Sequence, residues 1–401
     1  MASIIDLLLT GVLIPDDDNK AKGNYKRQIV VFKPGYTPSA ASVADLGGEV
    51  IKELPLINGV VGNFAQPISP RSLAIHPEIL RIDEDLPVEI VPRSLSNFAP
   101  FLLLALLFLS ANSLQSDREE RIVPWGVEDI GAPAVWPLTK GEGVKVAVID
   151  TGVDLEHFNL QANLRPGINL LQAGEAPRDG NGHGTHVAGT IAAMGVNNSL
   201  VGVSPGVEVY PVRALDDKGK GWLSDIISGI QWCIDNRLQV INMSFVVNGA
   251  NDSLRETVMA ADRAGIVLVA AAGNNGPGEN TVGYPARYPE TIGVAAINRH
   301  KQIADFSSRG PQVDLIAPGA NVLSLWPGGG IRSLNGTSMA APHVTGVVAL
   351  LISAAGPASP AVIKKHLKQT AKRLPNLQDT EQGAGLVDAR AALRVVAKSR
   401  S

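Results

Sequence analysis

The chain has 401 residues, with 35 lysines and arginines against 38 aspartates and glutamates and a formal net charge of −3 at pH 7. This length is enough for one large domain and a smaller one. Nucleic-acid binding needs a clustered basic face, which this composition does not suggest. The single cysteine, Cys233, excludes an internal disulfide, and its apolar helical surroundings predict a small buried side chain.

Residues 1–26 form an N-terminal tail that begins apolar. It carries Asp6 and lacks a basic start, so it matches a secretory signal peptide poorly. Residues 27–92 show short β-rich runs and two helical stretches. The expected strands cover 28–32, 50–54, 60–64 and 79–82, and the expected helices cover 39–46 and 70–75. This β-α-β-β-α-β order predicts a small ferredoxin-like domain.

A connector, residues 93–118, contains the apolar run from Phe98 to Leu109, interrupted by Pro100. As a helix this run would reach about 18 Å, whereas a bilayer core needs about 30 Å. Membrane contact is therefore not expected. The run predicts a plug against another domain or a hydrophobic linker that processing removes. The polar stretch from Asp117 to Arg121 predicts an exposed, cleavable site.

Residues 119–401 form a larger region in which β-rich runs alternate with helices. The expected strands cover 144–149, 207–212, 240–243 and 266–270. The expected helices cover 183–193, 222–236, 254–264, 337–353 and 360–372. This alternation predicts an α/β domain with a doubly wound, mostly parallel sheet and helices on both faces.

Two polar residues follow expected strands, at the sheet edge where α/β proteins bind ligands. Asp150 ends the run Val-Ala-Val-Ile-Asp, where it is either a functional carboxylate or a cap for the next turn. Asn274 lies in Ala-Ala-Ala-Gly-Asn-Asn-Gly, where it is either a turn residue or an amide donor for a developing negative charge. Neither sequence segment alone shows which of the two roles its polar residue has.

A glycine-rich run, Asp179 to Thr190, contains His183 and His186. The glycines allow a sharp turn that brings His183 to a surface. Histidines three positions apart can share a metal, but no third ligand is evident nearby, so His186 is expected to be a packed group behind His183. The run lacks the lysine of a phosphate-binding loop and the spacing of a dinucleotide-binding one.

Ser338 lies in Asn-Gly-Thr-Ser-Met-Ala-Ala-Pro-His, at the start of an apolar helix. Pro342 lacks an N–H and belongs near a helix start, which places Ser338 in the first turn. Free N–H groups and the helix dipole favour negative charge there. A hydroxyl becomes a good nucleophile when a base takes its proton and donors stabilise the oxyanion that follows.

The order Asp, His, Asn, Ser, with glycines beside each, resembles the subtilisin-like serine proteases. The matching stretches are Val-Ile-Asp-Thr-Gly-Val-Asp, His-Gly-Thr-His-Val-Ala-Gly-Thr, Ile-Asn-Met-Ser, Ala-Ala-Gly-Asn and Gly-Thr-Ser-Met-Ala-Ala-Pro-His-Val, and the resemblance covers roughly 120–395. It implies a serine endopeptidase that cuts polypeptides through an acyl-enzyme without a catalytic cofactor. Ser338 would attack, His183 would transfer the proton, and Asp150 would orient His183. Asn274 and the Ser338 N–H would hold the oxyanion.

Residues 27–92 resemble the family's propeptide, which implies a self-inhibited zymogen that binds its own propeptide in cis and works as a monomer. The processing site would fall near Val88 to Val91, or later in the unusually long connector. A full-size propeptide favours export, whereas the lack of a clear signal leaves a cytoplasmic location as the alternative.

The resemblance also implies two walls of a substrate pocket. The residues concerned are Ser244, Phe245, Val246, Ala271, Ala272, Gly273 and Ala286. Relatives commonly continue Met-Ser with Leu-Gly-Gly, whereas this chain has Phe-Val-Val. Because valine is bulkier than glycine, we expect an altered, narrower pocket entrance.

A structural calcium site is a further expectation from the family. The candidate ligands are Asn159, Met194, Asn197, Asn198 and Leu200. Oxygen ligands suit Ca²⁺, but Asn159 stands where relatives often have a carboxylate, so binding would be weakened.

Two other classes stay open from the sequence. The first is a non-catalytic binding or regulatory protein with the same fold, for which the Phe-Val-Val departure leaves room. The second is a nucleotide-binding α/β protein, which only the strand–helix alternation favours. Labelling by a fluorophosphonate separates both from an active serine protease.

Overall fold

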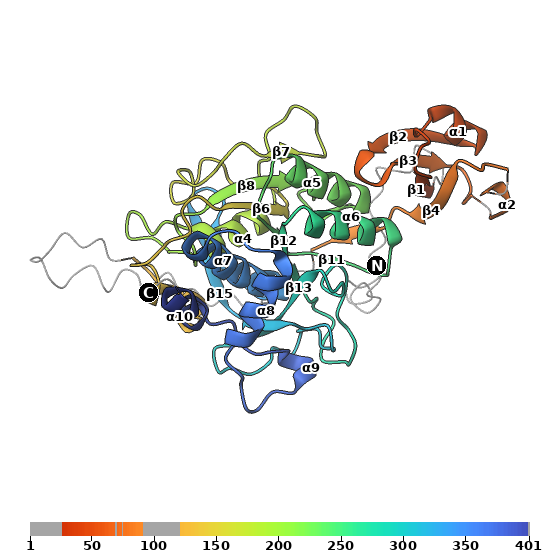
Figure 1. The fold of residues 1–401 in the computed structure, drawn as a ribbon. Helices are drawn as coiled ribbons and strands as arrows, with labels where there is room; N and C mark the ends of the chain where they lie inside the picture. The colour runs from red at the N-terminus through yellow and green to blue at the C-terminus, as the bar shows by residue number, and fades with distance from the viewer. Residues whose placement is uncertain (1–25, 69, 74, 91–120, 400–401) are drawn as a thin grey trace, which may run out of the picture. The chain divides into compact units, whose positions relative to one another are not determined.

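The computed structural model describes residues 26–68, 70–73, 75–90 and 121–399. The chain divides into two compact units, Met1–Glu84 and Asp85–Ser401 (Figure 1). The N-terminal tail up to residue 25 and the apolar run 98–109 lie outside the described residues.

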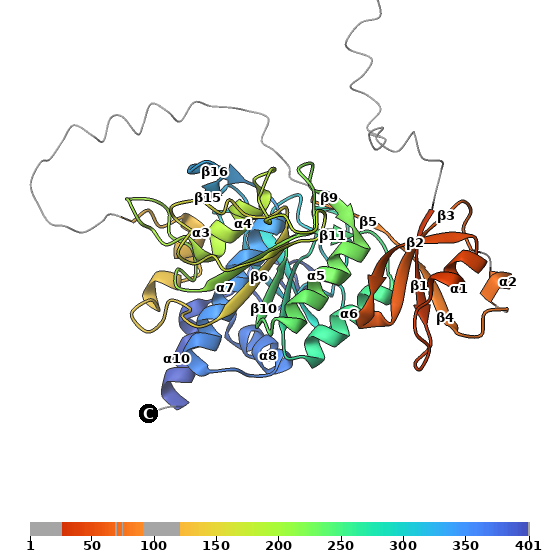
Figure 2. The same ribbon diagram turned by 90° about the horizontal axis from the view of Figure 1, so that it is seen from above.

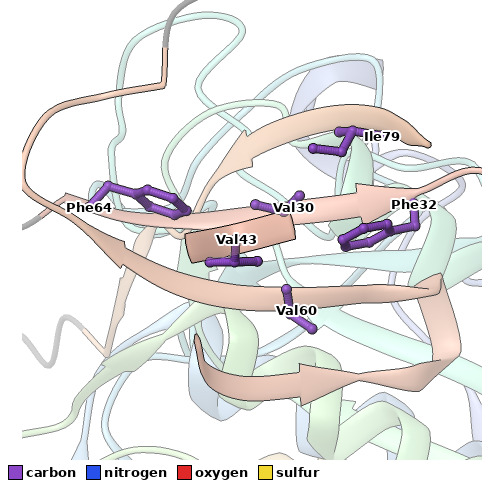
Figure 3. Packing of buried hydrophobic residues seen from close by; sticks show 6 residues of the cluster. All are labelled: Val30, Phe32, Val43, Val60, Phe64 and Ile79. Carbon is purple, nitrogen blue, oxygen red and sulfur yellow. The ribbon is translucent and has the colours of Figure 1, made fainter. Parts of the chain in front are cut away.

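The first unit is a four-stranded antiparallel sheet in the order β2-β3-β1-β4. Its elements are β1 (Lys26–Phe32), α1 (Ala40–Asp45), β2 (Gly48–Leu54), η1 (Pro55–Ile57), β3 (Gly59–Phe64), α2 (Pro70–Leu73) and β4 (Ile79–Glu84). A small core forms between α1 and the sheet from Val30, Phe32, Val43, Val60, Phe64 and Ile79 (Figure 3). The element order is the predicted β-α-β-β-α-β.

The second unit is built on a seven-stranded sheet in the order β14-β13-β12-β10-β6-β8-β7. Its strands are β6 (Lys145–Asp150), β7 (Ile168–Asn169), β8 (Glu208–Arg213), β10 (Val240–Met243), β12 (Val267–Ala271), β13 (Thr291–Ile297) and β14 (Leu315–Pro318). Neighbouring strands pair in parallel throughout. The predicted α/β class with a mostly parallel sheet is confirmed.

Helices cover both faces of this sheet (Figure 2). The helices α5 (Leu223–Asp235) and α6 (Asp252–Arg263) pack together on one face, and α4 (His183–Ala192) and α7 (Thr337–Ala355) pack together on the other. The remaining helices are α3 (Trp125–Asp129), η3 (Ala132–Ala134), α8 (Pro360–Thr370), α9 (Asp379–Gln382) and α10 (Ala389–Ser399). The sheet is therefore doubly wound.

The helix α7 is long and apolar enough to meet the length requirement of a membrane span. It contacts β10, β12, β13 and β14 along its length, and nearly all of its residues are buried. It is accordingly the central core helix of this unit.

Two buried histidines connect the helices of this face to their surroundings. His186 on α4 lies with Nε2 3.1 Å from the carbonyl oxygens of both Val322 and Arg332, and His343 on α7 donates from Nδ1 to the Met339 carbonyl at 2.8 Å. Burial lowers the pKa of His186 to about 3 and that of His343 to about 4. Both rings are therefore neutral in the native state near pH 7.

These two histidines predict acid sensitivity of the fold. In the unfolded chain both would protonate near their ordinary pKa of 6.5, whereas the folded rings resist protonation. Stability is therefore full above pH 6.5 and is lost as pH falls below it, by about 1.4 kcal/mol per pH unit for each histidine. Denaturant unfolding of the Ser338→Ala chain between pH 8 and pH 5 measures this slope. The His186→Gln variant should lose about half of it, and an unchanged slope would contradict the assignment.

Candidate active site

Asp150 is the last residue of β6, at the carboxyl end of the parallel sheet, and is fully buried. Its carboxylate oxygens lie 2.8 and 3.0 Å from His183 Nδ1, and Thr151 N donates to Oδ1 at 2.8 Å. A buried carboxylate needs such donors. Because both partners of Nδ1 are acceptors, Nδ1 carries a proton, and in the neutral ring Nε2 is the acceptor.

Asp179 holds the turn that presents His183 as the first residue of α4. Its Oδ1 accepts hydrogen bonds from Gly182 N and Thr151 Oγ1, each at 2.8 Å. Gly182 has φ 106°, and a Cβ there would lie 2.3 Å from the ring of Trp326, so both the conformation and the space require glycine. Asp179 thus joins the strand end that carries Asp150 to the helix start that carries His183.

Ser338 lies in the first turn of α7 and is buried, with 7% of its surface exposed. Pro342, in the second turn, has no N–H to donate to the Ser338 carbonyl. The Ser244 hydroxyl supplies that bond instead, at 2.9 Å, while the Ser338 hydroxyl donates to the Ser244 carbonyl, also at 2.9 Å. Two reciprocal hydrogen bonds therefore link Ser338 to the residue after β10.

A buried polar chain continues behind this pair. Asn242 Nδ2 donates to Ser244 Oγ at 2.8 Å, and Thr345 Oγ1 donates to Asn242 Oδ1 at 2.9 Å. Within the described residues, the Ser338 hydroxyl thus bonds to the Ser244 carbonyl rather than to His183.

Asn274 follows β12 and faces the start of α7. Its Oδ1 accepts from Thr337 N at 2.9 Å and from Thr337 Oγ1 at 3.0 Å. These two donors fix which amide atom faces Thr337, so the Nδ2 donor is directed elsewhere. A Cβ on Gly336, where φ is 153°, would lie 3.3 Å from this Nδ2. The amide donor therefore lies beside the turn that carries Ser338.

The expected pocket residues lie on two backbone segments that flank Ser338, except for Ala286, which lies on a third. Ser244 and Phe245 are buried, and Val246 on β11 (Val246–Val247) is half-buried. On the other side, Gly273 N donates to Thr337 Oγ1 at 3.0 Å, so the end of β12 reaches the serine turn. Ala271, Ala272 and Ala286 are buried beside it.

An extended segment, β5 (Pro87–Glu89), lies in a small three-stranded sheet beside the segment that carries Val246 (Figure 2). It pairs antiparallel with β11 on one side and with β9 (Lys220–Trp222) on the other. Glu89 lies opposite Val246, and Ile90 N donates to the Gly219 carbonyl at 3.0 Å. The antiparallel pairing therefore runs from Val88 opposite Val247 to Glu89 opposite Val246, in the direction of Ser244, which contacts Ser338.

The two histidines of the glycine-rich run do not face a common metal position. His186 Nε2 is engaged with two backbone carbonyls, and His183 Nδ1 faces Asp150. In the part of the chain that the structure describes, no group of three or more His, Cys, Asp or Glu side chains could hold a metal ion.

The expected calcium loop, 194–200, is joined to Asn159 by hydrogen bonds. Asn159 Nδ2 donates to the Leu200 carbonyl at 2.7 Å, and Val196 N donates to Asn159 Oδ1 at 3.1 Å. Met194 N donates to the Asn159 carbonyl at 3.1 Å. A carbonyl on one side and an N–H on the other fix the orientation of the amide. The Asn159 nitrogen, a hydrogen-bond donor, faces the Leu200 carbonyl oxygen, which a calcium ion would need as a ligand. The arrangement of Asn159 and Leu200 therefore does not fit calcium.

Two further expected ligands of that loop are asparagines in a left-handed backbone conformation. Asn197 and Asn198 are exposed, and their φ values of 53° and 55° place both in the left-handed region. Asparagine tolerates that region better than most residues, which accounts for the pair without an ion.

A doubly wound α/β domain with a bonded Asp–His pair and a serine at the start of an adjacent helix is the arrangement of a serine hydrolase. Residues 141–385 match the model of the subtilase family. The chain belongs to the subtilase family and is a serine endopeptidase that acts on polypeptides.

Three curated relatives illustrate the match. Subtilisin amylosacchariticus from Bacillus subtilis subsp. amylosacchariticus is 37% identical over 376 residues, covering 92% of this chain and 90% of the relative. Subtilisin from Bacillus pumilus is 44% identical over 274 residues, covering 67% and 98%. Subtilisin Savinase from Lederbergia lenta is 43% identical over 274 residues, covering 68% and 99%.

Several residues near the site were not among the predicted ones. They are Asp179, Asn242, Thr337 and Thr345. Asp179 and Asn242 lie inside motifs that the sequence already displays, so proximity in sequence was an available signal. Thr345 follows Ser338 by two helical turns, and only the packing of α7 on β10 brings it to Asn242.

Proposed function

We propose that Asp150, His183 and Ser338 form the catalytic triad of this endopeptidase. The observation that carries the proposal is the buried Asp150–His183 pair, whose bonds of 2.8 and 3.0 Å to Nδ1 leave Nε2 as the base. The Ser338 hydroxyl leaves the Ser244 carbonyl, gives its proton to Nε2, and attacks the scissile carbonyl carbon. Protonated His183 then gives that proton to the departing amine. The acyl part of the substrate remains bound to Ser338 as an ester.

Water completes the cycle. The oxygen of a water molecule attacks the ester while His183 Nε2 takes a proton from that water. His183 then returns the proton to Ser338 Oγ as the acid product leaves. The Asn274 amide and the Ser338 N–H stabilise the oxyanion in both halves of the reaction. Support for this role is the fixed orientation of Asn274, whose oxygen is held by Thr337.

The chain is proposed to be a self-inhibited zymogen whose residues 27–92 act as a propeptide in cis on a monomer. Support comes from β5, which fills the edge between β9 and β11 that a substrate backbone would use. Asp85 anchors its start, because its carboxylate accepts from Ser224 N at 2.8 Å and Ser224 Oγ at 2.9 Å near the start of α5. N-terminal sequencing of purified protein tests this: the wild-type chain should be cut in the connector, residues 93–118, and the Ser338→Ala chain should stay uncut.

We also propose that the 194–200 loop is closed by the Asn159 amide in place of a calcium ion. The thermal midpoint of the Ser338→Ala chain should then be the same in calcium chloride and in EDTA. Asn159→Asp removes the donor to the Leu200 carbonyl and places a carboxylate against it. In EDTA this should cost about 1–3 kcal/mol of stability, part of which calcium restores.

The matched control is Asn159→Ala, which loses the amide without supplying a carboxylate. It should be destabilised in both solutions and should not respond to calcium. A marked calcium dependence of the chain that keeps Asn159 would contradict the proposal.

A further inference from the structure

We infer that Val246 fills the pocket that receives the side chain of the residue whose carbonyl Ser338 attacks, so that this protease cuts after glycine or alanine. This inference rests on the proposed role of Ser338. It names the substrate class that the same site accepts.

Three backbone segments enclose the pocket and are tied to one another. Gly283 N donates to the Ala272 carbonyl at 2.9 Å, which joins the 283–284 segment to the end of β12. Val247 N donates to the Tyr284 carbonyl at 2.7 Å, and Tyr284 N donates to the Val247 carbonyl at 3.3 Å, which joins that segment to β11. The walls therefore cannot easily separate.

Ser338 closes one end of this enclosure. Its hydroxyl contacts the Ser244 carbonyl on the β11 side, and its neighbour Thr337 accepts from Gly273 N on the β12 side. A substrate residue bonded to Ser338 must therefore place its side chain between these two walls.

The Val246 side chain already lies in that space. A Cβ on Gly283 would lie 2.2 Å from Val246 Cγ1, and a Cβ on Gly273 would lie 3.5 Å from Val246 Cγ2. Contacts below 3.0 Å are not tolerated, so the isopropyl group rests against the bare backbone of Gly283 and reaches toward Gly273. One side chain thus spans the distance between two walls.

Val246 cannot move aside at low cost. Alternation along the segment turns Phe245 and Val247 into the core, where they are 1% and 0% exposed, and leaves Val246 on the pocket side. A β-branched side chain has little freedom about χ1, and the bonds between Val247 and Tyr284 fix the backbone beside it.

The consequence is selection by size at the position before the cut. The methyl group of alanine or the hydrogen of glycine fits beside Val246. The phenyl ring of phenylalanine would overlap Val246 and would stay exposed to solvent. We expect kcat/KM for otherwise identical peptides to favour alanine over phenylalanine at that position by about 100-fold or more. Val246→Gly should shift this ratio toward phenylalanine by at least about tenfold.

The test uses processed enzyme and two fluorogenic peptides that differ only in alanine or phenylalanine before the cut. Val247→Ala is the matched control, because it shortens the next residue of β11 in the core and should leave the ratio unchanged. Peptidyl phosphonate esters with the same two side chains give a second measurement, the rate of inactivation.

The outcomes separate this inference from the triad proposal. If a simple fluorophosphonate labels the enzyme and phenylalanine is accepted as well as alanine, only the inference is overturned. An unchanged ratio in Val246→Gly would overturn it as well. If neither peptide is cut and no phosphonate reacts, the triad proposal fails and the inference falls with it.

Discussion

The Ser338→Ala variant is expected to lose on the order of 10⁶-fold in kcat, the size known for the same change in subtilisin itself rather than one worked out from this chain. The substitution removes only Oγ, and with it the atom that forms the acyl ester. The Ser338 carbonyl keeps its bond from Ser244 Oγ, so the start of α7 should keep its conformation. Initial rates on a peptide substrate measure the loss, with both proteins freed of residues 27–92 by an added protease that is then inactivated, and with their concentrations fixed by absorbance.

The matched control for this variant is Ser324→Ala. Ser324 is buried and its hydroxyl donates to the His186 carbonyl at 2.8 Å, away from the reacting atoms. It should stay within a few-fold of wild type. A Ser338→Ala enzyme that retained even a few per cent of wild-type kcat would show that another group is the nucleophile.

Asp150→Asn should reduce kcat by about 10⁴-fold with little change in KM, again the scale known from serine-protease triads. The amide nitrogen would donate to His183 Nδ1, which forces the proton onto Nε2. The base for Ser338 is then lost although every side chain keeps its place. Steady-state kinetics on one peptide, together with unfolding to confirm retained stability, provide the measurement.

Asp154→Asn is the corresponding control, because it removes one negative charge four positions further along. Asp154 accepts from Glu156 N and Gly328 N rather than from His183. Its kcat should remain close to wild type. Equal losses in the two variants would mean that charge near the site, and not the bond to Nδ1, controls the rate.

The sequence predicted the frame of the second unit from strands that alternate with helices. The strands β6, β8, β10 and β12 and the helices α4, α5 and α7 begin and end within two residues of their expected positions. The strands β13 and β14 were not predicted. All seven residues of β13 are buried, so it shows no period-two alternation, and β14 is a four-residue run that ends at a proline.

The sequence predicted which residues form the candidate site and their order along the chain. Their positions in space could be learned only from the fold. Pro342 was expected near a helix start, but it lies in the second turn of α7. Because it has no N–H there, the Ser338 carbonyl accepts its hydrogen bond from the Ser244 hydroxyl instead. No sequence pattern says where the Ser338 hydroxyl points. That direction depends on the packing of α7 against β10.

For two departures from the family pattern, only the structure indicates what the changed residues do. The Phe-Val-Val run indicated a changed pocket entrance, but the alternation of its side chains singles out Val246. Asn159 in place of a carboxylate indicated weaker calcium binding. Only its bonds to Leu200 and Val196 suggest that an amide closes the loop instead.

The most direct test of the central claim is to react processed enzyme with a fluorophosphonate and to locate the adduct by peptide mass mapping. We expect one adduct per chain, on Ser338, and none in Ser338→Ala. An adduct on another residue, or a processed enzyme that cuts peptides without forming any adduct, would contradict it.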